Sequence, residues 1–349
     1  MPRGGFETGR VFGPDLARGI ALLGMFAAHV AFEGPEHFYD GRSAILFATV
    51  AGVSLGLLTG GAHPAPTGER TGLRGGIALR ALALIVIGVL LSQLVRPPLA
   101  VILDYYGFAF LLLVPLLFAR PWVLALVGAL VVVIAPAVVN WLLLHVDPGR
   151  IPAPILPPAD WLVFGVYPMA IWLAFPLAGL LAARADLTRR RTQVLLLAAG
   201  VFTALIGYGA AAVLPGVDAE AHSGSVAEVV GSGGVAIAII GAATLLGDLP
   251  GAAGRGIRWV LYPVAAAGGM VLSLYTAHAI ALALVREVVS GGAERWRYPD
   301  LVLPVLIVSA LVIGTLWRRF LGAGPLERLL KLISSLESPR AGRASAPRV

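Results

Sequence analysis

The residues best suited to chemistry begin in the first apolar segment, about residues 15–33. Asp15 and Arg18 lie near its start and His29 near its end. On a helix, Arg18 and His29 would be about 16 Å apart along the axis but only about 20° apart around it. One face of one helix would therefore carry a guanidinium, which binds anions, near one membrane surface. The same face would carry an imidazole, which can act as a base near neutral pH, near the other surface.

Each of these residues also has a structural interpretation. The Asp15 carboxylate can cap the first turn of the helix, and Arg18 can extend to lipid headgroups. His29 can be held by a hydroxyl group of a neighbouring helix. We favour a functional role because ionisable groups inside a membrane are costly and because other polar side chains fall at the same predicted depth as His29.

Those other side chains come from the first loop and from the fourth and ninth apolar segments. They are His37, Arg42, Asp104, Tyr275 and His278. With His29 they form the predicted catalytic group, in which a histidine removes a proton from an acceptor and Arg42 or Tyr275 stabilises an oxyanion. Alternatives remain at two positions, because His37 can be a solvated surface residue and Asp104 can cap its helix.

Ten apolar segments of membrane-spanning length would position these residues. They cover about residues 15–33, 43–61, 76–95, 99–118, 121–144, 161–183, 193–214, 227–247, 260–286 and 300–320. With both termini inside, 20 of the 26 Arg and Lys residues fall on the cytoplasmic side and six on the outer side, as cytoplasmic loops require. We therefore predict an all-α polytopic membrane helical bundle of about ten transmembrane helices, N-in and C-in.

Composition supports this class and excludes others. The chain of 349 residues is 58% hydrophobic and 13% charged, with a mean hydropathy of +0.88. Its net charge of +7 comes from Arg residues dispersed in short loops and in a basic tail, so we expect contact with membrane lipids and no nucleic acid. There is no Cys, and no two His residues share one helix at ligand spacing, so we predict no metal site. Ligands from separate helices are left open.

We assign residues 1–333 to a single transmembrane domain. Residues 322–333 have the pattern of an amphipathic helix on the inner surface, and residues 334–349 form a predicted disordered basic cytoplasmic tail. A homodimer is one arrangement that the sequence allows.

Five short motifs, taken in order, resemble those of a known family. They are Asp15-x-x-Arg18-Gly19-x-Ala21 with Gly24-Met25, Ile45-Leu46-Phe47 leading to Gly52, Ile102-Leu103-Asp104-Tyr105-Tyr106-Gly107, Gly268-x-Met270-x-Leu272-Ser273-x-Tyr275, and Trp317-x-x-Phe320 with Gly324-Pro325-Leu326-Glu327. Together they resemble the YeiB-like bacterial membrane proteins and the related heparan-alpha-glucosaminide N-acetyltransferase catalytic domain. YeiB-like members carry amide residues where this chain has His29 and His278.

The resemblance implies a transmembrane acyltransferase that takes acetyl-CoA or another acyl-CoA from the cytoplasm. The histidine of the acetyltransferase corresponds to His29 or to His37, and it would serve a glycan or small-molecule acceptor at the opposite face. We expect the phosphates of CoA to be bound on the inner side by a group of cations that includes the start of the first helix. The predicted group is Asp15, Arg18, Arg70, Arg74 and Arg80.

The leading functional prediction is therefore an integral inner (plasma) membrane acyltransferase that modifies an extracytoplasmic or lipid-linked glycan. The alternative is a membrane transporter for a small anionic or amphipathic solute. A transporter would favour an internal repeat and acidic residues at mid-span, and neither is visible in this sequence.

Overall fold

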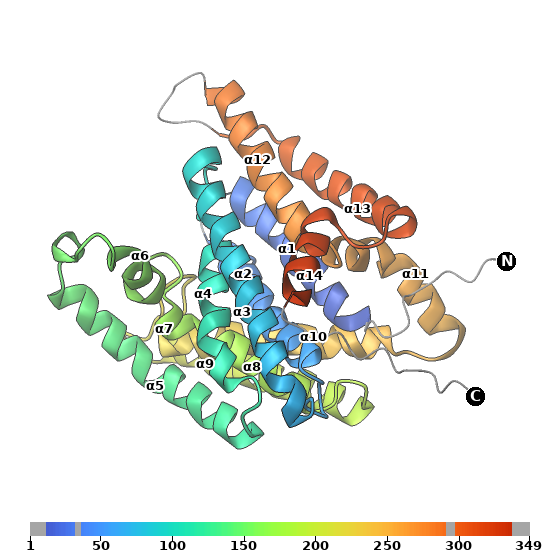
Figure 1. The fold of residues 1–349 in the computed structure, drawn as a ribbon, viewed down its shortest axis with the longest axis horizontal. Coiled ribbons are helices and arrows are strands. Elements are labelled where there is room, and N and C mark those ends of the chain that lie inside the picture. The colour runs from blue at the N-terminus through green and yellow to red at the C-terminus, as the bar shows by residue number, and fades with distance from the viewer. Residues whose placement is uncertain (1–11, 32–35, 291–296, 337–349) are drawn as a thin grey trace, which may run out of the picture.

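The computed structural model describes residues 12–31, 36–290 and 297–336. The described residues form helices and loops with no strand among them (Figure 1). The helices are α1 (Phe12–Val30), α2 (Arg42–Leu58), α3 (Thr67–Leu90), α4 (Leu103–Leu113), α5 (Pro121–His145), α6 (Leu156–Ala159), α7 (Met169–Trp172), α8 (Ala174–Arg184), α9 (Arg190–Val213), α10 (Val226–Gly247), α11 (Gly251–Gly268), α12 (Val271–Ser290), α13 (Val302–Phe320) and α14 (Pro325–Ser335). The all-α prediction is confirmed for this part of the chain.

Six of the described helices are long and apolar enough to cross a membrane. They are α3 with its π-helical extension to Val95, α5, α9, α10, α12 and α13. Helices α6 to α8 add a seventh if the pair Leu156–Phe164 and Met169–Arg184, bent by 54°, is one span. Helices α1, α2 and α4 lie at the first, second and fourth predicted spans but are not among the six. Several apolar helices are thus compatible with a multi-pass membrane protein, while ten spans and the N-in orientation stay predictions.

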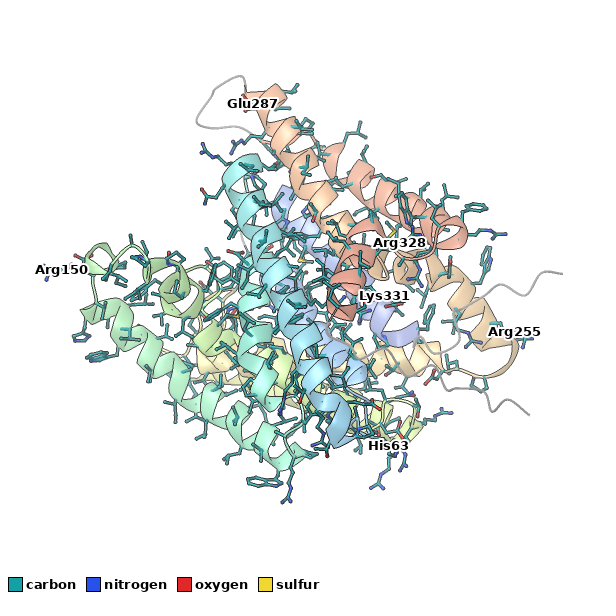
Figure 2. The ribbon with its side chains drawn as sticks, viewed as in Figure 1. His63, Arg150, Arg255, Glu287, Arg328 and Lys331 are labelled. Atoms are coloured by element: carbon teal, nitrogen blue, oxygen red, sulfur yellow. The ribbon has the colours of Figure 1, made fainter. Side chains whose placement is uncertain are left out.

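The polar ends of the helices fall on two opposite sides of the bundle. In Figure 2, Arg150 and Glu287 lie at the left and upper edges, and His63 and Arg255 lie at the lower and right edges. The topology predicted from the sequence would place the first pair on the outer side and the second pair on the inner side. Between these edges, α5, α9 and α13 expose many Leu, Val and Ile side chains, as lipid-facing helices do.

Glycines allow the closest helix contacts. A Cβ atom on Gly207 of α9 would lie 2.3 Å from the backbone nitrogen of Gly231 in α10. In the centre of the bundle, a Cβ atom on Gly19 of α1 would lie 2.0 Å from the carbonyl oxygen of Val264 in α11. Backbone contact at these points packs α1 against α11 and α9 against α10.

The structure corrects the predicted ninth span. The segment 260–286 is not one helix, because α11 ends at Gly268 and α12 begins at Val271. The carboxylate of Glu327, in the first turn of α14, accepts hydrogen bonds from the backbone N–H groups of Leu272 and Ser273 at 2.8 and 3.2 Å. It also accepts one from the Ser273 hydroxyl at 2.5 Å. Donors at the new helix start are thus satisfied by a distant part of the chain, which lets the helix break there.

This cap also places α14. The predicted amphipathic helix packs on the bundle, and Leu330 is buried. The predicted tail from residue 334 overlaps the end of α14, and residues 337–349 lie outside the described residues.

We expect Glu327→Ala to lower the free energy of unfolding by about 1 to 3 kcal/mol, because a charge-assisted helix cap is lost and buried N–H groups lose their acceptor. The matched control is Arg328→Ala, which removes the exposed neighbouring side chain and should change stability by about 0.5 kcal/mol or less. Thermal unfolding of the detergent-purified proteins measures both. Equal shifts in the two variants would show that the Glu327 cap does not hold α12.

Candidate functional site

One cavity lies beside the N-terminal half of α1 and has a volume of about 500 Å³. Its walls are largely apolar and include Phe47, Leu84 and Phe110. Four charged residues from three separate parts of the chain also line it, namely Asp15, Arg18, Arg80 and Glu327. A cavity with a charged end and an apolar body fits a ligand that has both an anionic and an apolar part.

We call this cavity the inner cavity, after its side in the predicted topology. Its two arginines are held differently. Arg18 forms an ion pair with Asp15, one turn earlier on α1, and also donates a hydrogen bond to the Ser54 hydroxyl of α2. Arg80 of α3 forms no hydrogen bond or ion pair with the described residues, although it interacts electrostatically with Arg18 and Glu327. Its guanidinium donors therefore remain available for an anionic ligand such as a phosphate.

Two other predicted anion-binding residues lie elsewhere. The guanidinium groups of Arg70 and Arg74 lie over the ring of Phe118, at 5.0 and 5.4 Å from its centroid. Arg70 also donates a hydrogen bond to the carbonyl of Ala65 at 3.0 Å. Neither residue lines the inner cavity.

The second cavity lies at the other end of α1 and has a volume of about 280 Å³. Its lining is rich in polar and aromatic side chains, among them His29, Tyr39, Asp40, Tyr167, His222 and Tyr275. Tyr39 lies in the loop before α2, where partial burial, together with the Asp40 charge, raises the pKa of its phenol. The Tyr39 hydroxyl therefore stays protonated at neutral pH and can donate a hydrogen bond.

His29 and His278 form a hydrogen-bonded pair at this second cavity, which we call the outer cavity after its side in the predicted topology. Their rings are parallel, and His29 Nδ1 lies 3.0 Å from His278 Nε2. His278 Nδ1 lies 2.6 Å from the carbonyl oxygen of Tyr275. Because a carbonyl can only accept, His278 Nδ1 carries a proton, and its Nε2 is the acceptor in the neutral ring.

His29 Nδ1 must then donate to His278 Nε2. In a neutral His29, Nε2 is left without a proton and makes no hydrogen bond with the described residues. The Tyr275 carbonyl thus fixes the tautomers of both rings and leaves Nε2 of His29 unprotonated. Because His29 lines the outer cavity, this residue is the candidate base there.

Tyr275 also lines this cavity and carries a phenolic hydroxyl oxygen. That oxygen accepts a hydrogen bond from the backbone N–H of Ile102 at 3.3 Å. The hydroxyl proton is therefore free to be donated to a ligand, as an oxyanion requires. The predicted catalytic residues His29, His278 and Tyr275 are thus together.

The remaining three predicted catalytic residues do not line either cavity. Arg42 donates to the Tyr208 hydroxyl and to Glu36, each at 2.7 Å. Asp104 accepts a hydrogen bond from the indole N–H of Trp161 at 2.9 Å, and its other carboxylate oxygen has no hydrogen-bond partner among the described residues. His37 packs against Tyr39 at 5.0 Å between ring centroids and lies 3.7 Å from Asp40.

Several lining residues were not predicted from the sequence. Glu327 and Ser54 join the inner cavity, and Tyr167 and His222 join the outer one. His222 lies in the loop before α10 with a positive φ of 65°, and its ring stacks near Trp172 at 6.0 Å between centroids. Glu327 stood in the Gly-Pro-Leu-Glu motif, and His222 fell in an outer loop of the predicted topology, so both had a signal in the sequence. In the part of the chain that the structure describes, no cluster of three or more His, Asp or Glu residues could hold a metal ion.

Comparison with known families supports part of the resemblance. Residues 178–336 match the family model described as "Protein of unknown function (DUF418)", which is the YeiB-like family. The matched region includes Tyr275, His278 and Glu327 but not α1 with Arg18 and His29. No curated protein matches the chain. The relation to the heparan-alpha-glucosaminide N-acetyltransferase domain stays a prediction.

Proposed function

We propose that this protein is an inner-membrane acyltransferase that moves an acyl group, an acetyl group in the simplest case, from cytoplasmic acyl-CoA to a hydroxyl or amine of an extracytoplasmic or lipid-linked glycan. The observation that carries the proposal is the pair of cavities along α1. One is lined by Arg18 and Arg80, and the other by His29. An anion site and a base at opposite ends of one helix suit a donor and an acceptor on opposite faces of a membrane.

The inner cavity fits an acyl-CoA in two respects. Arg80 has guanidinium donors that no described residue uses, and phosphate groups are strong acceptors for them. The apolar walls formed by Phe47, Leu84 and Phe110 suit the less polar arm and the acyl group.

The outer cavity supplies the groups for transfer. His29 Nε2 removes the proton from the acceptor hydroxyl or amine, whose oxygen or nitrogen then bonds to the thioester carbonyl carbon. The Tyr275 hydroxyl donates a hydrogen bond to the oxygen that becomes negatively charged. The carbon–sulfur bond breaks, and the leaving thiolate receives the proton that His29 holds.

Ligand binding to the purified protein tests the first half of this proposal. We expect acetyl-CoA to raise the melting temperature, because a ligand at about 100 times its Kd stabilises by about 2.7 kcal/mol. Arg80→Gln should weaken this binding by about 10- to 100-fold, since it removes charge-assisted hydrogen bonds to a phosphate.

Arg74→Gln is the matched control, because Arg74 lies on the same helix but over Phe118, outside the cavity. Its affinity for acetyl-CoA should equal that of the parent. Equal losses of affinity in both variants would indicate nonspecific charge attraction. If acetyl-CoA does not stabilise the parent protein, acetyl-CoA is not the donor.

A further inference from the structure

We propose that Tyr106 and Phe47 form a side-chain wall between the two cavities and determine which acyl groups can pass from one to the other. The identity of the passing group rests on the function proposed above, but the existence of the wall does not. A transfer between the two sites needs such a passage, because the charged residues of the inner cavity and His29 line separate cavities.

Tyr106 of α4 connects the two cavities. Its side chain lines the inner cavity, and its hydroxyl donates a hydrogen bond to the carbonyl of Ala44 at 2.8 Å. Ala44 of α2 lines the outer cavity. The same hydroxyl interacts electrostatically with Tyr167 and Tyr275, which also line the outer cavity. The phenol thus extends from one cavity to the edge of the other.

Phe47 and α1 complete the wall. The Phe47 ring stacks on the Tyr106 ring, with 5.2 Å between centroids and 23° between planes. On α1, Arg18, Leu22, Met25 and His29 share one stripe by their spacing. Arg18 lines the inner cavity and Met25 the outer one, while Leu22 between them is completely buried and lines neither.

We expect the wall to open by rotation of the Tyr106 and Phe47 side chains. One hydrogen bond, to a backbone carbonyl, holds the Tyr106 hydroxyl. Phe47 is only partly buried, and both rings border a cavity of about 500 Å³ that can receive a rotated side chain. Rotation of two aromatic side chains needs no movement of the helices.

A passage opened by the rotation of only two side chains should admit a thin unbranched arm with a small acyl group. We expect it to exclude a ring system such as a nucleobase, which would stay beside Arg18 and Arg80. Smaller residues at positions 47 and 106 should therefore extend the range of acyl groups that can reach His29.

Cysteine labelling tests the wall without any acyl-CoA, since the chain has no Cys of its own. Single reporters Ala51→Cys in the inner cavity and Ala28→Cys in the outer one are exposed to a small anionic methanethiosulfonate in sealed vesicles of each orientation. In the parent background, each reporter should react from one side only, and the two from opposite sides. In the Tyr106→Ala background, Ala51→Cys should also react from the side that labels Ala28→Cys.

Phe110→Ala is the matched control, because Phe110 lies one turn further along α4 and lines only the inner cavity. It should leave labelling one-sided. Tyr106→Phe keeps the ring and removes the hydrogen bond, so it should speed labelling across the wall by roughly threefold to tenfold. If Tyr106→Ala does not fold, Tyr106→Phe still tests the wall.

Three outcomes would overturn the wall: both reporters reacting from one side in the parent, one-sided labelling retained in both Tyr106 variants, or equal opening by Phe110→Ala. Failure of acetyl-CoA to stabilise the protein would instead reject the proposed function and leave this labelling result standing.

Discussion

Replacement of His29 by alanine is expected to slow acyl transfer by about 10²- to 10⁴-fold and to leave the affinity for acetyl-CoA unchanged. The physical reason is that His29 Nε2 is the proposed base at the outer cavity, whereas the proposed donor would bind beside Arg18 and Arg80, which line the inner one. Transfer of radiolabelled acetyl groups in membranes that contain the acceptor measures the rate, and the thermal shift measures donor binding.

His37→Ala is the control for this variant. His37 lies in the neighbouring loop, beside Tyr39 and outside both cavities, so its loss should change the rate by less than a factor of about three. If the His37 variant is inactive and the His29 variant is fully active, the base is His37 in the loop. Full activity in both variants would reject the histidine-base mechanism.

The second large effect is expected at His278. His278→Leu should lower the rate by about 10- to 100-fold, because His29 would lose the acceptor that keeps the proton on its Nδ1, and the basic nitrogen would no longer be fixed at the cavity. His278 positions the base and does not itself face the outer cavity.

A conservative variant separates this positioning role from a packing role. His278→Gln retains an oxygen that can accept from His29 Nδ1 and should recover most of the rate. KM for acetyl-CoA should be unchanged in both variants, with the loss confined to kcat. If His278→Gln and His278→Leu are equally slow at equal melting temperatures, the tautomer argument is wrong.

The stripe on the first helix could be predicted from the sequence because helical spacing alone determines it. Arg18 and His29 lie on one side of α1 and line the two cavities. Spacing also separates the other three predicted anion-binding arginines. Arg70 and Arg74 are four residues apart and share a helix face, but Arg80 is about 240° further around from Arg74. Only Arg80 of this group reaches the inner cavity.

Tertiary contacts set the remaining features, and these could not be read from local patterns. Tyr106 and Asp104 are about 200° apart around α4, so a Tyr106 that faces the inner cavity turns Asp104 towards Trp161. The break between α11 and α12 depends on Glu327, which is more than 50 residues away along the chain. Hydropathy could not reveal it, because the apolar run continues through the break.

The most direct test of the proposed acyl transfer is a cryo-EM structure of the protein with a non-hydrolysable acetyl-CoA analogue. We expect density for the phosphates beside Arg18 and Arg80, with the pantetheine arm passing between Phe47 and Tyr106. The acyl end should lie within hydrogen-bonding reach of His29 or Tyr275. Density at any other site, or an empty inner cavity at saturating analogue, would contradict this proposal.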